Sequence, residues 1–493
     1  MAFEFNQTNL FKLKKEKVCE FAVSGKLSSD DGENVVGILK CSYFPQINTC
    51  EITGNIATVL GQTNVEICYL KEDGSAKNMR GAIEWQNKCE VGEIDDAKIS
   101  AKIKDAQVEI QNNAVYFSCL IELGAEGTMS VGVYNLAENE NVAAKKTSKE
   151  IKSICAYSKE KFTIAEDISL EGADNVICVC PQIETIAAVA GENKAQISGT
   201  AYLEIICETE NGVSSTFKAI DFSEEIALLG ATIGGEVYSS IGVENCEYIF
   251  TPSEEKGQLS VTISAVCENV CYKQEEVELT TDAYALDRQT KQTSSCEELQ
   301  SVMEYKTESK QTTFAENCDC LDGFDEFVCA SVYGGTEWFA ENEEGGTNIS
   351  GSVAICLVYK TEEGKMRTKI THVPYNFSVE EANAEIESVV VKNLAAKVRG
   401  AHEIVLDVSF DVGYFITTTD YLEFISGLED CGELEDDDSA IMVAIAGEND
   451  DAFSLGKRLH AKPEDVLSQN ENASFAAGEK VFVYKHKEEN FNY

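Results

Sequence analysis

A short segment occurs three times in the chain, and this internal repeat constrains the fold more than any other feature. The copies read VLGQTNVEICYLKEDG, QISGTAYLEIICETENG and NISGSVAICLVYKTEEG and span residues 59–74, 196–212 and 348–364. Each copy has an anchor glycine (Gly61, Gly199 or Gly351) and a closing glycine thirteen residues later. The anchors lie 138 and 152 residues apart, whereas solenoid and propeller repeats are only about 20–50 residues long. We therefore expect three homologous domains, each large enough to bury its own core.

Each copy alternates apolar and polar residues, as a strand with one buried face does. In the first copy, Val65, Ile67 and Tyr69 alternate with more polar positions such as Glu66. Each strand ends in Asp-Gly, Asn-Gly or Glu-Gly. Asp-Gly and Asn-Gly are strong hairpin signals because a type I′ turn needs positive φ at both central residues. The pattern predicts one β-hairpin in each copy.

An aromatic residue follows each closing glycine by ten or eleven positions, at Trp85, Phe222 and Tyr375. These residues lie on the expected second strand of the hairpin. We interpret them as core anchors, with ligand platforms as the alternative.

Composition excludes some classes of partner. The 493 residues carry a formal net charge of −46, which repels nucleic acid and anionic lipid. A basic protein partner is permitted, although solubility alone also explains an acidic balance. No secretion signal is visible, and no apolar run approaches the roughly 18 residues of a membrane span. We therefore expect a cytoplasmic protein without membrane insertion, whose nineteen scattered cysteines are free thiols.

Short strands with frequent turn signals predict a mainly all-β fold of three repeated β-sandwich-like domains. We place these domains at residues 1–155, 156–322 and 323–428. The polar segment 272–322 is either a connection between domains or a helical or strand lead-in to the third copy. The acidic run 429–438 is interpreted as a linker, because it lacks the spaced ligands and turn glycine of a calcium loop. A small domain follows at 439–487.

The small C-terminal domain is expected to have the order β-α-α-β. A strand at 440–445 precedes a helix that Asp450 or Asp451 caps. Pro463 begins the second helix, in the first turn, where its missing N–H has no cost.

The rest of this domain completes the pattern. Val466 and Leu467 are expected to face inward, and Asn470 closes the second helix. Residues 478–483 return as a strand.

No arrangement of residues indicates catalysis or a bound cofactor. The pairs Cys178/Cys180 and Cys318/Cys320 lack the spacing of a four-ligand zinc site. Four scattered histidines do not support a Ser-His-Asp or Cys-His assignment, and no phosphate-binding loop appears. We predict no catalytic residue, no cofactor and no metal.

The segment LGKRLHAKPEDVLSQNENASFAAGEKVFVY resembles a LysM domain. The matching positions are Leu455, Lys457, Arg458, Leu459, Pro463, Glu464, Val466, Leu467, Asn470, Gly478, Lys480 and Val481. Many sugar-binding members carry Gly-Asp-Thr-Leu-Trp before the first helix, whereas this chain has the more acidic Gly-Glu-Asn-Asp-Asp-Ala-Phe from Gly447.

The three copies, the Asp282–Leu286 segment (DAYAL) and the LysM-like end together resemble the SPOCS-domain family of SipL-like spore-coat morphogenetic proteins in endospore-forming Firmicutes. The resemblance implies a non-enzymatic scaffold on the mother-cell side of the forespore surface. It also implies that the LysM-like end docks a protein of the coat basement layer.

The LysM resemblance implies a set of residues on or beneath a docking surface: Leu455, Lys457, Arg458, Pro463, Asn470 and Lys480. Leu455 and Leu459 are expected in the core. One alternative function is binding of peptidoglycan or another N-acetylglucosamine polymer, and another is a hydrolase that LysM targets to its substrate. A homo-oligomer is compatible with all of these.

Overall fold

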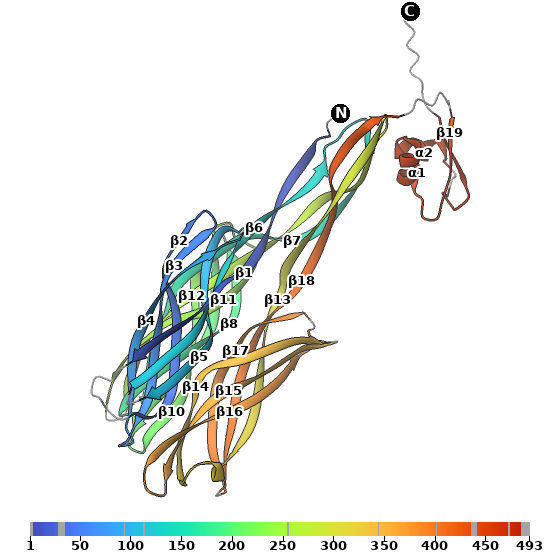
Figure 1. The fold of residues 1–493 in the computed structure, drawn as a ribbon. Helices are drawn as coiled ribbons and strands as arrows, with labels where there is room; N and C mark the ends of the chain where they lie inside the picture. Colours follow the sequence, from blue (N-terminus) through green and yellow to red (C-terminus); the bar gives the residue numbers. More distant parts are fainter. Residues whose placement is uncertain are drawn as a thin grey trace, which may run out of the picture.

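The computed structural model describes residues 3–27, 35–92, 94–111, 114–253, 256–343, 345–381, 383–400, 402–434, 441–471 and 474–484. Antiparallel strands make up most of these residues, and the two α-helices found among them are short and lie near the C-terminus (Figure 1). The prediction of a mainly all-β fold is confirmed.

The first repeat unit contains six strands in two three-stranded sheets. The strands are β1 (Phe5–Leu27), β2 (Val35–Thr53), β3 (Ile56–Lys71), β4 (Ala76–Glu90), β5 (Asp95–Gln111) and β6 (Ala114–Leu136). One sheet has the order β1-β6-β5 and the other β2-β3-β4. A shared apolar core fills the space between them, so the unit is a β-sandwich.

The second and third units repeat this topology. The second contains β7 (Val142–Glu171), β8 (Asn175–Gly191), β9 (Lys194–Thr209), β10 (Gly212–Ala227), β11 (Glu236–Thr251) and β12 (Lys256–Ala285). The third contains β13 (Arg288–Asn317), a short 3₁₀ turn (Cys318–Cys320), β14 (Phe324–Glu343), β15 (Gly346–Thr361), β16 (Met366–Val379), β17 (Ala384–Arg399) and β18 (Glu403–Glu433). In each unit the first, sixth and fifth strands form one sheet, and the second, third and fourth form the other. Each unit has its own core.

The repeated hairpins lie in the second sheet of each unit, at β3–β4, β9–β10 and β15–β16. The closing glycines Gly74, Gly212 and Gly364 have φ of 84°, 103° and 75°, as the hairpin prediction requires. The expected inward positions, such as Val65 and Ile67, are buried. The hairpin prediction is confirmed in all three copies.

Each anchor glycine lies directly opposite its aromatic residue in the hairpin. The pairs are Gly61–Trp85, Gly199–Phe222 and Gly351–Tyr375, and all three aromatic side chains are buried. A Cβ on Gly199 would lie 2.7 Å from the Phe222 ring and 2.3 Å from the Glu184 carbonyl oxygen. The glycine therefore makes room for the ring, and the prediction of core anchors is confirmed.

The first and sixth strands of each unit form three long ribbons, β1–β6, β7–β12 and β13–β18. Strands β7 and β12 have 30 residues each, enough to span about 100 Å. The ribbons extend beyond the sandwiches and run together as a stalk (Figure 1). The stalk has its own apolar core, made of Leu10, Val133, Ile151, Val277, Leu279, Leu299, Leu422 and Phe424.

Strand pairing divides the chain differently from the sequence-based boundaries. Strand β7 runs through residues 155 and 156, and β13 at 288–317 pairs with β18 of the third unit. The segment 272–322 thus contains the end of β12 and the first strand of the third unit, which is the strand lead-in alternative. Residues 429–433 of the expected acidic linker belong to β18, and residues 435–438 lie outside the described part of the chain.

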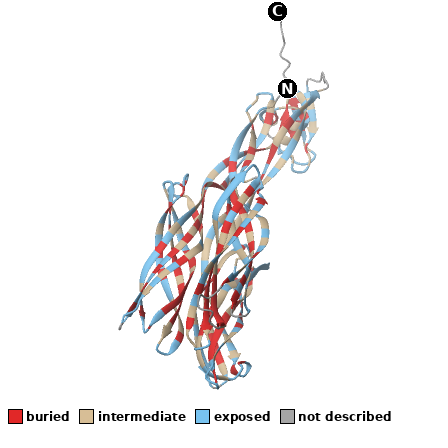
Figure 2. Cartoon of the chain, turned by 60° about the vertical axis from the view of Figure 1, so that its left-hand side comes forward, coloured by how far each residue is buried: buried red, intermediate tan, exposed pale blue. Residues whose placement is uncertain are grey.

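The three sandwiches also pack against one another. Leu39, Ile177 and Val328 contribute to a shared apolar cluster with residues of all three hairpin sheets. Buried residues, red in Figure 2, continue from the sandwiches into the stalk.

The C-terminal module, residues 441–484 where described, has the predicted order of elements. These are β19 (Ile441–Ile445), α1 (Ala452–Leu459), α2 (Pro463–Gln469) and β20 (Lys480–Tyr484), with β19 and β20 antiparallel. Asp451 caps α1 in a capping box with Ser454.

The inward prediction is correct for Val466 and wrong for Leu467. Val466 is fully buried, whereas 52% of Leu467 is exposed. Neighbouring residues on a helix point about 100° apart, and this short helix presents one narrow face to the module core.

Across the described residues, no helix has both the length and the apolar character needed to cross a membrane.

Candidate docking site

Two of the predicted docking residues support the module from within. Leu455 is fully buried in the module core beside Leu459, as expected. The Asn470 amide donates to the carbonyl oxygens of Val466 (2.9 Å) and Phe482 (2.7 Å), and its Oδ1 accepts from the Phe482 N–H (3.0 Å). Asn470 therefore ties the end of α2 to β20.

The two basic residues of α1 are engaged within the chain. Lys457 Nζ lies 2.5 Å from Asp282 Oδ1 at the end of β12. Arg458 Nη2 donates to the Ile445 carbonyl oxygen (2.8 Å) and lies 3.2 Å from Asp450 Oδ2. Their cationic groups thus bind other parts of this protein.

Of the last two predicted residues, Lys480 is the strand partner of Ile445, whose carbonyl oxygen accepts from Arg458. Pro463 is half-buried at the first position of α2, and Lys480 is exposed at the start of β20. That these six residues lie on or beneath one docking surface stays a prediction.

A different surface of the module has the character of a docking site. On the outer face of the β19–β20 sheet, Ile441 lies opposite Tyr484, and Val443 lies opposite Phe482. The exposed fractions of the large apolar side chains here are 47% (Ile441), 53% (Val443), 60% (Ile445), 39% (Phe482) and 54% (Tyr484). We call these five residues the outer apolar face. Lys480 lies beside them, opposite Ile445.

The inner face of the same sheet explains why the strands form. Ala444, Val481 and Val483 alternate with the outer residues and pack against α1 and α2. The sequence IMVAI is apolar at every position, a pattern typical of strands buried on both faces. That pattern is the sequence signal from which the outer apolar face could have been suspected.

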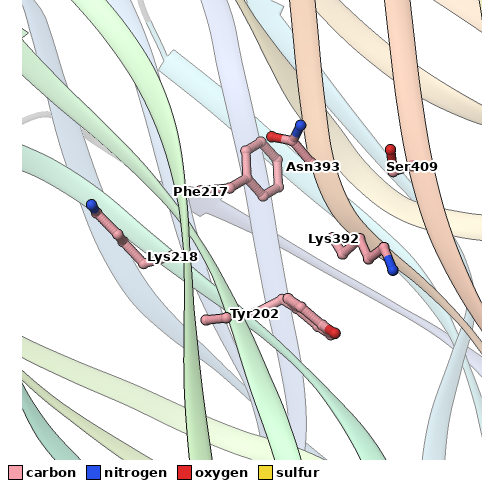
Figure 3. Close-up of a pocket in the computed structure, with 7 residues that line it drawn as sticks. Tyr202, Phe217, Lys218, Lys392, Asn393 and Ser409 are labelled. Carbon is pink, nitrogen blue, oxygen red and sulfur yellow. The ribbon is translucent and has the colours of Figure 1, made fainter.

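A hollow of about 420 Å³ lies between the second and third sandwiches (Figure 3). Its lining is Tyr202, Phe217, Lys218, Ala219, Lys392, Asn393 and Ser409. Lys392 Nζ is 2.7 Å from Asp411 Oδ1, and the Tyr202 hydroxyl donates to Asp411 Oδ2 (2.9 Å). Figure 3 shows the Lys218 side chain pointing away from the other lining residues. The polar groups of the hollow therefore serve the interface between the sandwiches.

Beside this hollow, two buried carboxyl groups share a hydrogen bond. Burial and the neighbouring Asp411 raise the pKa of Glu184 to about 7. Burial opposes the charge of Asp411, but hydrogen bonds from Lys392 and Ser309 outweigh it and lower the pKa of Asp411. Both carboxyl groups are closed off from solvent, so substrate cannot reach them as the chain is folded.

The cysteines are free thiols, as expected. Cys178 and Cys180 lie with their sulfur atoms 3.2 Å apart where the sandwiches meet. The hydrogen bond with Cys180 and burial raise the pKa of the Cys178 thiol, which makes it a poor nucleophile. Within the ranges that the structure describes, no group of three His, Cys, Asp or Glu residues is placed to hold a metal ion.

Among the described residues, the outer apolar face gathers five exposed large apolar side chains on one small sheet. Comparison with known proteins adds no relative from which a role can be transferred. No family model, no curated protein and no solved structure matches the chain.

Proposed function

We propose that this protein is a non-enzymatic assembly scaffold that docks a protein partner on the outer apolar face of its C-terminal module. The observation that carries the proposal is the exposure of five large apolar side chains on one small sheet. Contiguous exposed apolar patches mark interaction sites, because leaving them in water is unfavourable.

The chemistry of the face favours a protein over a glycan. Small-molecule sites are concave and present a small number of precisely placed polar groups. The outer apolar face lies on one side of a two-stranded sheet, and only Tyr484 of its five side chains carries a polar atom. A protein with a complementary apolar patch buries this surface well.

The rest of the chain supports a role in holding the C-terminal module accessible to a partner. The stalk separates the module from the three sandwiches (Figure 1), so a partner can reach it without contacting them. The net charge of −46 repels a second copy and favours a partner with basic residues around its apolar patch.

The resemblance to SPOCS-domain and LysM proteins supplies a specific setting for the proposal. In that setting the partner belongs to the basement layer of a spore coat, and the protein works in the mother-cell cytoplasm at the forespore surface. Peptidoglycan binding through the LysM-like module is the alternative.

The test compares two valine substitutions that introduce the same charge. Val443→Glu places a carboxylate in the outer apolar face, and Val398→Glu places one on an exposed position of β17 in the third sandwich. The full-length proteins capture partners from sporulating-cell extract, the main partner is identified, and its affinity is measured with purified components. We expect Val443→Glu to weaken binding at least about tenfold and Val398→Glu to leave it unchanged within about twofold.

Other outcomes contradict the proposal. Equal binding by both variants, and by a chain that ends at Gly432, would place the contact in the sandwiches or the stalk. Binding to purified peptidoglycan that Val443→Glu abolishes, without a protein partner, would establish the glycan-binding alternative.

A further inference from the structure

The α1 side of the C-terminal module contacts the end of the β7–β12 ribbon (Figure 1). The Tyr284 hydroxyl donates to the Ala461 carbonyl oxygen at 2.6 Å. His460 Nδ1 lies 3.2 Å from the Ala285 carbonyl oxygen, and Lys457 pairs with Asp282 as described above. The module thus contacts three of the four residues from 282 to 285.

Tyr284 is the anchor of this contact. Its neighbour Ala283 faces the stalk core and packs with Leu136 and Ile425, so Tyr284 points to the opposite face of the ribbon. Only 2% of Tyr284 is nevertheless exposed, and its ring meets Phe453 of α1 edge-on at a centroid distance of 5.1 Å. The module is what covers this side chain.

Gly456 provides independent evidence for a built contact. It lies in the middle of α1, where glycine weakens a helix relative to alanine. A Cβ at this position would lie 2.4 Å from the Tyr284 hydroxyl oxygen and 2.7 Å from the Ala461 carbonyl oxygen. The tyrosine occupies the space that any other residue would need.

We infer that the end of the β7–β12 ribbon is a docking site for α1 of the same chain, with Tyr284 as its anchor and Gly456 as the residue that determines the fit. The docked module turns its helices toward the stalk and its β19–β20 sheet away from it (Figure 1). The contact therefore orients the outer apolar face. It depends on this chain alone and holds whether or not the proposed partner exists.

The ion pairs at this contact are secondary. The side chains of Lys457 and Asp282 are 39% and 30% exposed, and those of Lys145 and Asp451 are 49% and 50% exposed at a separation of 3.0 Å. Solvent-exposed pairs of this kind contribute little. Docking is accordingly expected to persist at high salt, held by the buried tyrosine.

The test measures hydroxyl-radical labelling of aromatic side chains in the full-length protein. Wild-type Tyr284 is expected to be labelled far more slowly than Tyr421, which is 55% exposed on β18. Gly456→Ala is expected to raise the labelling of Tyr284 toward that of Tyr421. Gly427→Ala is the matched control, because a Cβ there lies 3.7 Å from Thr293, an ordinary contact.

A second variant separates undocking from unfolding of the module. Tyr284→Ala lies outside the module, so it should expose Phe453 to labelling while amide hydrogen exchange in α2 and β20 stays unchanged. Tyr421→Ala is its control. Rapid labelling of wild-type Tyr284, or unchanged labelling of Phe453 in Tyr284→Ala, would overturn the inference.

Discussion

At the scale of single residues, Glu184 is a buried carboxyl group beside a second one, Asp411. This residue is 3% exposed in the interface between the second and third sandwiches. The groups around it are Asp411, Lys392, Thr307 and Tyr202. Two carboxyl groups in hydrogen-bond contact cannot both ionise at low cost, so one proton is held between them.

This arrangement predicts a pH dependence. The folded-state pKa of Glu184 is about 7, above the ordinary value of about 4.3 for glutamate. The folded protein therefore binds this proton more tightly than the unfolded chain, and the contribution of Glu184 to stability falls as the pH rises between these two values.

Glu184→Gln is expected to remove the loss of stability that ionisation of Glu184 causes at high pH. At pH 8 the variant should exceed wild type in free energy of unfolding by about 2–3 kcal/mol, and the difference should shrink below pH 5. Denaturant titrations at both pH values measure it, with the exposed Glu363→Gln as the control. An equal difference at pH 5 and pH 8 would show that Glu184 does not hold this proton.

At the scale of elements, one β-bulge recurs in all three units. In the second strand of each unit, one extra residue without a strand partner follows the residue paired with Tyr69, Cys207 or Tyr359. Each of these three strand partners lies eight residues after its anchor glycine. The bulged residues are Leu39, Ile177 and Val328, and all three pack into the apolar cluster between the sandwiches. A bulge redirects a side chain, and here it supplies apolar contacts to the neighbouring units.

Strand β8 allows a matched test, because it contains a second bulge at Ile186. Ile177 is 3% exposed and Ile186 is 58% exposed. Ile177→Ala is expected to cost about 2–4 kcal/mol of unfolding free energy, because it leaves a cavity between the sandwiches. Ile186→Ala is expected to change it by less than about 0.5 kcal/mol. If denaturant titrations show an equally small change in unfolding free energy for Ile177→Ala and Ile186→Ala, then other contacts hold the sandwiches together.

At the scale of the whole molecule, one buried ion pair connects all three sandwiches. Lys40 Nζ of the first lies 2.5 Å from Glu204 Oε2 of the second and 2.8 Å from the Val332 carbonyl oxygen of the third. Glu204 Oε1 accepts from the Val332 N–H at 2.9 Å. Burial opposes the charge of Lys40, but the Glu204 carboxylate outweighs it and raises the pKa of Lys40. Lys40 is therefore charged inside an apolar junction.

Removing one member of this pair leaves an uncompensated buried charge. Lys40→Met is expected to lower the free energy of unfolding by about 3–5 kcal/mol. Lys40→Met combined with Glu204→Gln should recover much of that loss, since the amide oxygen can still accept from the Val332 N–H. Thermal or denaturant unfolding of both variants measures this. Lys397→Met, at an exposed pair with Asp407, is the control and should change stability by less than about 1 kcal/mol. If the double variant is no more stable than Lys40→Met, the uncompensated buried charge of Glu204 is not what destabilises the single variant.

The sequence by itself determined the features that depend on near neighbours. Alternation around Val65 and Ile67, the closing glycines and the Pro463 helix start predict the three hairpins and the β-α-α-β order, because hairpin turns and helix caps are decided within a few residues. The buried aromatic partners of the anchor glycines were also predictable, since hairpin register follows from the turn.

Only the tertiary structure decided which surfaces meet. Cys68, Ile206 and Val358 alternate to the outer side of their strands, yet all are buried, because three sandwiches converge there. Lys457 was predicted to lie on or beneath a docking surface, and the fold pairs it with Asp282, which is 175 residues away. Such contacts depend on how the three ribbons pack side by side. Local alternation shows that a face is apolar or charged, but the assembled fold determines whether that face is covered by the same chain or left open to another molecule.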